Sequence, residues 1–286
     1  MIPEAEAQKF LEELGISKLP VIPRDICNRL GISYFEEPLK NIDGYLVVEP
    51  KSGNGFIGVN SSIKEPGRRN FTGAHELGHF CIDSFNQSTF YCSKETIESR
   101  SRKVPPIELR ANKFAAELLM PTHIYHPLVN DRSPGWDVIK ELASMSETSL
   151  LSTALRFVEL TDYACALIVS ENSQISWFQK SKMFSAYIDM NSKILSPHTY
   201  AYAASKGLIP PNEFEMVKAD NWISGRGVKP HTEILEWTLP INSYGQVLTI
   251  LLDEEGIGGW EENGYEDDDD EIEWEPPTFH KSKRKK

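Results

Sequence analysis

Two histidines and a glutamate near residue 75 have the types and the spacing of a metal-binding catalytic site. They lie in the segment Ala74–Phe80, which contains the pattern H-E-x-x-H. On a helix, His75 and His79 lie one turn apart on the same face, so that both imidazoles reach one tetrahedral metal ion, for which zinc is the usual choice. Glu76 then stands beside the open coordination position, where it can take the proton of a zinc-bound water. The pattern predicts hydrolysis of a peptide bond.

The neighbouring residues predict that this helix is buried. Phe71, Leu77 and Phe80 place large apolar groups on its flanks. The alternative is an exposed helix turn that carries polar residues by chance. Two histidines and a glutamate on a buried helix are costly unless a partner satisfies them, which favours the metal site.

A third metal ligand is expected from a second amphipathic helix, which lies between the prolines that flank residues 107–120. Glu108 stands in its first turn and would complete a His-His-Glu site. Asn112 follows one helical turn later on the same face, where it would hold a ligand in place. Glu117 is the competing ligand, although it lies half a turn round the helix. The alternative for Glu108 is a solvated glutamate favoured by the helix dipole.

The two segments together resemble the ImmA/IrrE family of metallo-endopeptidases. The resemblance rests on RRNFTGAHELGHF at residues 68–80 and on E-x-x-A-N-x-F-A-A-E-L-L-M-P at residues 108–121, and it extends over about residues 1–160. It implies a compact zincin-like domain with Zn²⁺ on His75, His79 and Glu108, and with Glu76 as the catalytic base. It also implies site-specific cleavage of a helix-turn-helix transcriptional repressor, in a stress, phage or mobile-element response.

Two other functions compete with a peptidase. In the first, zinc is structural and the protein is a regulatory binding module that acts by association without proteolysis. An open coordination position argues against it, because four protein ligands normally close a structural zinc site. In the second, the chain is a DNA-binding regulator that uses helices in residues 136–160.

Length and composition describe an ordinary soluble protein with room for two domains. The chain has 286 residues, of which 40% are hydrophobic and 25% charged. It has no apolar run long enough to span a membrane, and its first residues do not form a signal peptide. The four cysteines form no C-x-x-C pair, so we expect reduced thiols in a cytoplasmic protein. They are Cys27, Cys81, Cys92 and Cys165.

The charge of the chain is strongly acidic and uneven. The net charge is −12. Ten acidic and no basic residues lie in 261–275, and five basic residues lie in 281–286, so that the rest carries −7. Nucleic-acid phosphates demand a positive face, so we expect no direct nucleic-acid binding. A protein substrate with basic patches, such as a DNA-binding repressor, suits this charge better.

Short elements are predicted before the metal-binding helix. Two helices are expected, the second ended by Gly31, and three strands follow, of which the last two form a β-hairpin. In chain order they are Ala5–Leu14, Val21–Leu30, Ile32–Phe35, Gly44–Val48 and Phe56–Asn60. Phe56–Asn60 is the candidate edge strand to which an extended substrate adds by main-chain hydrogen bonds. Arg68 and Arg69 are expected to pair with acidic neighbours.

The segment between the two metal-binding helices, Ser84–Lys103, is polar and predicts a long loop. Zinc peptidases commonly use a tyrosine or histidine to stabilise the oxyanion. Four residues are candidates, and the sequence does not choose among them: Tyr91, His123, Tyr125 and His126.

Residues 136–160 predict two helices with a break near Ser146, in a pattern that resembles a helix-turn-helix. The pair has little basic charge, which makes it weak support for DNA binding. The family resemblance implies that the pair packs on the peptidase domain and contributes to substrate recognition, and this is what we expect.

The sequence predicts an α+β protein in which a smaller α/β domain, residues 161–260, follows the peptidase domain. A hairpin is expected from Tyr163–Val169 and Gln174–Phe178, a later strand at Gln246–Leu252, and helices at Tyr200–Lys206 and His231–Trp237. The family resemblance makes a GAF-like sensor one expectation for this domain. The charged tail, residues 261–286, is expected to be disordered because it has too little to bury.

Overall fold

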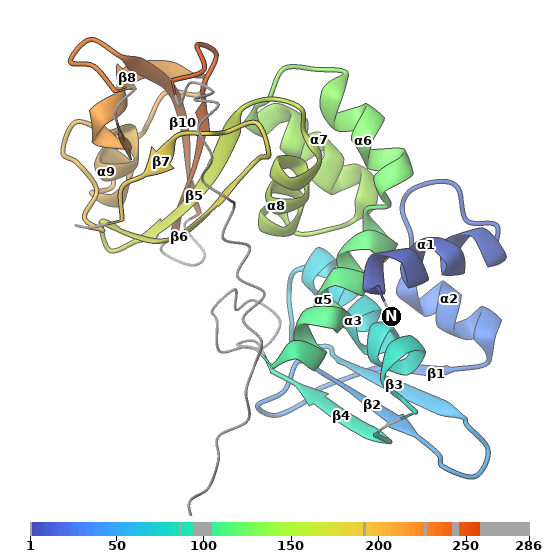
Figure 1. Cartoon of the computed structure of the whole chain (residues 1–286). Helices are drawn as coiled ribbons and strands as arrows, with labels where there is room; N and C mark the ends of the chain where they lie inside the picture. Colours follow the sequence, from blue (N-terminus) through green and yellow to red (C-terminus); the bar gives the residue numbers. More distant parts are fainter. Residues whose placement is uncertain are drawn as a thin grey trace, which may run out of the picture.

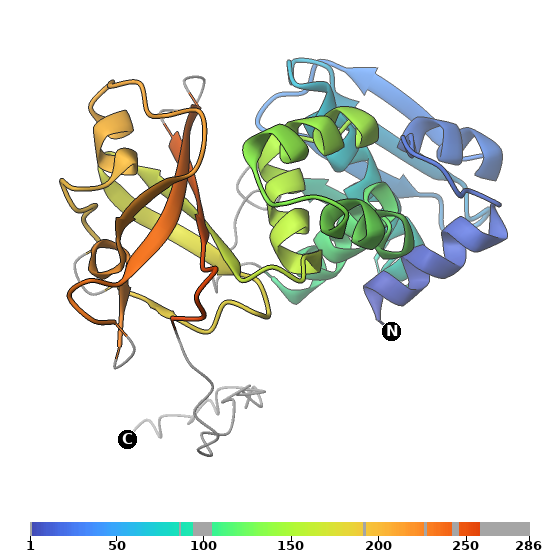
Figure 2. The same ribbon diagram turned by 90° about the horizontal axis from the view of Figure 1, so that it is seen from above.

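The computed structural model describes residues 2–85, 87–93, 105–190, 193–225, 228–241 and 246–257. It is a mixed α+β protein whose described residues form a four-stranded, a five-stranded and a two-stranded sheet, with a group of helices between the two larger sheets (Figures 1 and 2). None of the described helices is long and apolar enough to cross a membrane. The charged tail lies outside the described residues.

The first sheet has four strands in the order β1-β3-β2-β4. They are β1 (Ser33–Glu37), β2 (Gly44–Val48), β3 (Gly55–Asn60) and β4 (Thr89–Cys92). The predicted hairpin is confirmed, because β2 runs antiparallel to β3. The predicted substrate edge is wrong: β3 is an interior strand, which also pairs in parallel with β1. The edge strands are β1 and β4. Strand β4, which pairs with β2, lies within the polar segment Ser84–Lys103, for which the sequence predicts a loop.

Four helices cover one face of this sheet. They are α1 (Pro3–Glu13), α2 (Pro23–Leu30), α3 (Pro66–Ile82) and α5 (Pro106–Leu119). Each begins at a proline, whose fixed φ suits the first turn and whose missing N–H costs nothing there. Gly78 lets α3 and α5 approach closely, since a Cβ at this position would lie 3.1 Å from the ring of Phe114.

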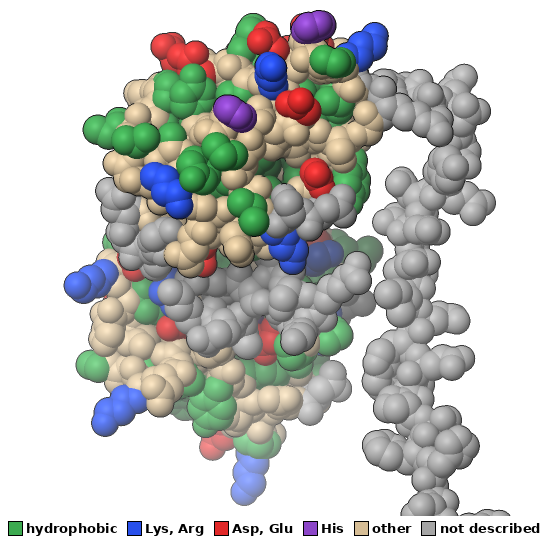
Figure 3. Space-filling view, turned by 90° about the vertical axis from the view of Figure 1, so that its left-hand side faces the viewer, with side chains coloured by type: hydrophobic (Ala, Val, Ile, Leu, Met, Phe, Trp, Pro, Cys, Tyr) green, Lys and Arg blue, Asp and Glu red, His purple; other side chains and the backbone are tan. Residues whose placement is uncertain are grey.

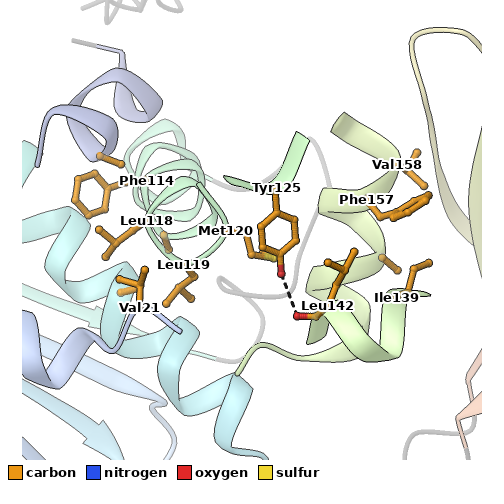
Figure 4. Packing of buried hydrophobic residues seen from close by; sticks show 14 of the residues in the cluster. Val21, Phe114, Leu118, Leu119, Met120, Tyr125, Ile139, Leu142, Phe157 and Val158 are labelled. Atoms are coloured by element: carbon orange, nitrogen blue, oxygen red, sulfur yellow. Dashed lines mark hydrogen bonds between the residues drawn. The ribbon is translucent and has the colours of Figure 1, made fainter. Parts of the chain in front are cut away.

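Three more helices follow: α6 (Thr122–Asn130), α7 (Trp136–Ser146) and α8 (Leu150–Leu160). The predicted break between the last two is confirmed. The pair packs on the first part of the chain, and the hydroxyl of Tyr125 in α6 donates to the carbonyl of Leu142 in α7 at 3.2 Å (Figure 4). The hydrophobic side chains in Figure 4 run from α5 to α8, so that these helices continue the core of the first part.

The second sheet is antiparallel throughout, in the order β6-β5-β11-β10-β8. Its strands are β5 (Cys165–Glu171), β6 (Gln174–Lys180), β8 (Glu215–Lys218), β10 (Glu233–Ile241) and β11 (Gln246–Leu252). The remaining elements are β7 (Tyr187–Ile188), α9 (Tyr200–Ser205), a 3₁₀ turn (Ala219–Asn221) and β9 (Ile223–Ser224). The predicted hairpin, the last strand and α9 are confirmed.

The helix predicted at His231–Trp237 is wrong, because most of this segment belongs to β10. Ile234 and Trp237 have a spacing that suits a helix, and both are buried. Pairing with β8 on one side and β11 on the other places them in a strand instead. Tertiary pairing therefore overrides the local pattern.

The hydrophobic core crosses the predicted boundary at residue 160. Phe157 and Val158 of α8 belong to the same buried cluster as Leu167 of β5. The indole N–H of Trp136 donates to the carbonyl of Trp237 at 2.9 Å, which joins α7 to β10. A separate domain at residues 161–260 stays a prediction, and the other face of its sheet has a hydrophobic cluster of its own.

Candidate metal centre

Helix α3 brings the two histidines of the H-E-x-x-H pattern together. His75 and His79 lie one turn apart, and both are fully buried. Their Nε2 atoms are 3.1 Å apart. Such close nitrogens on a buried face suit two ligands of one ion.

Glu108 reaches the same point from α5. Its Oε2 lies 3.1 Å from Nε2 of His75 and 3.6 Å from Nε2 of His79. Burial raises the pKa of Glu108, but the two adjacent imidazoles of His75 and His79 outweigh burial and lower this pKa to about 2. The structure therefore brings together all three predicted ligands, with ligand atoms within 4.8 Å of one another.

The Nδ1 atoms of both histidines face acceptors. Nδ1 of His75 lies 2.9 Å from Oδ1 of Asn112, as expected for the predicted supporting residue. Nδ1 of His79 lies 3.0 Å from Oδ2 of Asp83. An amide oxygen and a carboxylate only accept hydrogen bonds here, so each Nδ1 carries the proton and each Nε2 lone pair is free for a metal.

Asp83 is a supporting residue that the sequence analysis missed. It is 1% exposed and also accepts a hydrogen bond from Arg110 of α5. Its position, four residues after His79, placed it on the same helical face, and this spacing was the available signal. Phe90 of β4 stacks on the ring of His79 with centroids 4.5 Å apart, which fixes the other side of this imidazole.

Glu76 is fully buried beside the first histidine. Its Oε1 accepts a hydrogen bond from the thiol of Cys92. Its Oε2 has no hydrogen-bond partner among the described residues. Burial raises the pKa of Glu76 to about 7, against the opposing effects of His75 and Cys92. Sequence reasoning missed Cys92, which became a neighbour of Glu76 only through strand pairing.

The donor set of this cluster fits a zinc ion. Two imidazole nitrogens and one carboxylate, with a fourth position open, form a common catalytic zinc site. Nε2 of both histidines and Oε2 of Glu108 converge without a fourth protein ligand among the described residues. The unpartnered Oε2 of Glu76 is a second sign of an open polar site, because an oxygen buried without a partner is costly.

The competing ligand, Glu117, does not reach the cluster. It is 1% exposed and pairs with Arg156 of α8. It also accepts from the backbone N–H of Thr122 at 2.8 Å and from the side chain of Gln8 at 3.0 Å. Glu117 therefore joins α5 to α1, α6 and α8.

The two arginines before α3 form the expected ion pairs. Arg68 pairs with Asp43, and Nε of Arg69 lies 3.7 Å from Glu36. Both ion pairs join α3 to the first sheet or to the turn beside it.

The four candidates for oxyanion stabilisation do not point at the cluster. Tyr91 is 64% exposed and faces the opposite side of the sheet from Phe90 and Cys92, as strand alternation requires. Tyr125 is buried, and its hydroxyl oxygen lies 2.5 Å from Oγ of Ser146.

The two histidine candidates also lie elsewhere. His126 lies 3.7 Å from Asp162. His123 lines a hollow of about 590 Å³ with Gln8 and Ile16 of the N-terminal segment.

The H-E-x-x-H segment of α3 and Glu108 of α5 together form a cluster that can hold a metal ion. The family model described as "IrrE N-terminal-like domain" of Peptidase M78 matches residues 27–156. The match over residues 27–156 supports membership of this part of the chain in the ImmA/IrrE family. The match contains all three predicted ligands and Glu76.

A solved structure shares the fold over most of the chain. It is described as "Mycobacterium tuberculosis transcriptional regulator", with a TM-score of 0.54 and 14% sequence identity. The similarity covers 88% of this chain and 75% of that one. It therefore extends beyond residues 27–156, which match the family model. No curated protein matches this chain.

Proposed function

We propose that this protein is a zinc-dependent endopeptidase. The observation that carries the proposal is the fully buried Glu76, whose Oε2 has no hydrogen-bond partner among the described residues and which follows directly on His75 of the His-His-Glu cluster. A peptidase needs a proton acceptor at such a place. A purely structural site does not, and would be closed by a fourth ligand.

Each residue of the site has a defined task in this proposal. His75, His79 and Glu108 hold the zinc ion, and Asn112 and Asp83 orient the two imidazoles. When bound, zinc acidifies a coordinated water to a pKa of about 7 and polarises the scissile carbonyl. Glu76 accepts a proton at Oε2 from the attacking water and then donates it to the leaving amine.

Strand β4 replaces β3 as the proposed docking edge for an extended substrate. Among the described residues, β4 pairs with β2 on one side and forms an edge of the sheet. Phe90 and Cys92 of this strand contact His79 and Glu76, so that a peptide added to its free edge would run beside the metal site.

A helix-turn-helix transcriptional repressor is the proposed substrate. The family supplies this expectation, and the acidic net charge of −12 suits a basic DNA-binding partner. On the face shown in Figure 3, lysine and arginine side chains stand among acidic and hydrophobic ones and form no continuous basic surface over the described residues. Four free cysteines suit a cytoplasmic location.

The test compares protein N-termini in cells that express the wild type or Glu76→Gln, with and without DNA-damaging stress. The matched control is Glu141→Gln, a change at a side chain that is 55% exposed and far along the chain in α7. We expect a new N-terminus with the wild type and the control, and its loss with Glu76→Gln. The same N-termini in all three would refute the role of Glu76.

Metal analysis of the purified proteins completes this test. Glu76→Gln keeps zinc because Glu76 is not a ligand, whereas His79→Ala loses it. Retention of full zinc by His79→Ala would refute the proposed centre.

A further inference from the structure

Cys92 and Gly44 form a slot for the carboxyl group of Glu76. They are directly paired residues on β4 and β2. The thiol of Cys92, which is 1% exposed, donates to Oε1 of Glu76. A Cβ at Gly44 would lie 2.9 Å from the same oxygen. Only a glycine at residue 44 therefore leaves room for the carboxyl group of Glu76.

In this slot the two carboxyl oxygens of Glu76 differ in their hydrogen bonding. Oε1 is held against the sheet by the thiol, while Oε2 has no hydrogen-bond partner among the described residues. The terminal torsion of a glutamate is broad, so that without a fixed partner the carboxyl rotates easily. One hydrogen bond at Oε1 therefore decides where Oε2 points.

We infer that Cys92 is a positioning residue, which holds the carboxyl of Glu76 so that Oε2 faces the reacting atoms. The inference rests on the proposed function, since it assigns Cys92 to the orientation of the proposed base. Cys92 does not touch substrate or metal in this assignment. It acts through Glu76.

The thiol is suited to this task by its protonation state. Burial raises the pKa of Cys92 well above its ordinary range, and the neighbouring Glu76 raises it further. The sulfur therefore keeps its hydrogen at neutral pH and remains a donor. Cys165 is equally buried, but its thiol contacts the hydroxyl of Ser181, just after β6, instead of a carboxyl group.

Three variants separate the hydrogen bond from the packing of the side chain. Cys92→Ala removes the donor, Cys92→Ser restores one with a hydroxyl, and Cys165→Ala is a matched buried cysteine outside the site. Cobalt replaces zinc as a coloured probe, and acetohydroxamate is the ligand. A hydroxamate chelates the metal through both oxygens and offers its proton to a neighbouring carboxylate, so its affinity reports on the position of Glu76.

We expect all three variants to bind one cobalt ion as the wild type does. Cys92→Ala should bind acetohydroxamate about 3- to 10-fold more weakly, which is the worth of one hydrogen bond. Cys92→Ser and Cys165→Ala should stay within about twofold of the wild type. Rescue by serine shows that a hydrogen-bond donor of this size, rather than the sulfur itself, is what the site requires at residue 92.

The outcomes distinguish this inference from the proposed function. No cobalt binding by the wild type removes the metal centre and the inference with it. Unchanged hydroxamate affinity in Glu76→Gln refutes the base. A weaker affinity in Glu76→Gln but not in Cys92→Ala overturns the role of Cys92 alone.

A second measurement requires no metal ion, and it does not depend on the folding of Cys92→Ala. The infrared S–H stretch of Cys92, identified as the band lost in Cys92→Ser, should shift in Glu76→Gln because its acceptor changes from a carboxyl to an amide. A band at the same frequency in both proteins would overturn the hydrogen bond on which the inference depends.

Discussion

Replacement of Asp83 by alanine should weaken zinc binding without altering any ligand. Asp83 accepts a hydrogen bond from Nδ1 of His79 at 3.0 Å, and it is held in turn by Arg110. Without this acceptor the imidazole loses its fixed orientation and its preference for the tautomer with a free Nε2.

The expected loss follows from the position of Asp83. Removal of a group that orients a metal-bound histidine typically costs about 10- to 100-fold in affinity, which is about 1.4 to 2.7 kcal/mol. The upper part of this range is expected, because Asp83 is 1% exposed and water does not readily replace it. Arg110 contributes less, since its side chain is 37% exposed and can be solvated.

The assay is a competition for zinc between the protein and a coloured chelator. Asp83→Asn should lie between the wild type and Asp83→Ala, because an amide oxygen still accepts from Nδ1 but lacks the charge. Asp162→Ala is the control, since this side chain is 73% exposed and lies beside His126. An Asp83→Ala protein with wild-type affinity would refute the assignment of the Nδ1 proton.

Three further predictions concern stability. Arg156→Met should lower the free energy of unfolding by about 3–5 kcal/mol, because it leaves Glu117 buried without its partner. In urea denaturation, the double variant Arg156→Met/Glu117→Met should recover much of this loss. An equal loss of stability in the single and double variants would contradict the pairing. Gly44→Ala should cost about 1–3 kcal/mol through the contacts that a Cβ would make with α3 and Glu76, and an unchanged urea midpoint would speak against so tight a slot. Zinc at about 100 times its dissociation constant should stabilise the fold by about 2.7 kcal/mol, reversibly with a chelator; no shift in Tm would count against a site in the folded state.

The elements that were predictable from the sequence are those whose signals are local. Prolines mark the start of α3 and α5, and a turn-forming cluster joins β2 to β3. The family motifs also lie on single helices, so that the direction of each side chain follows from its position in the helix. These signals place His75 and His79 one turn apart on one face of a helix, which is how they lie in α3.

The elements that were missed depend on pairing partners far along the chain. Strand β4 has only four residues, in a polar segment, and it exists because β2 offers it an edge. The segment His231–Trp237 has a helical spacing of apolar residues, but two flanking strands make it β10. The prediction of β3 as the substrate edge is wrong for the same reason, because the order of strands in a sheet depends on pairing between segments that are distant in the sequence.

The sequence by itself determined the chemistry of the candidate site: two histidines, their neighbouring glutamate and a carboxylate on a second helix. Helical periodicity is local, so four-residue spacings carry this information directly. Only the tertiary structure decided that Glu117 pairs with Arg156, that β4 is an edge strand of the first sheet over the described residues, and that Cys92 contacts Glu76. These contacts depend on packing and strand register between distant segments, which no short stretch of sequence specifies.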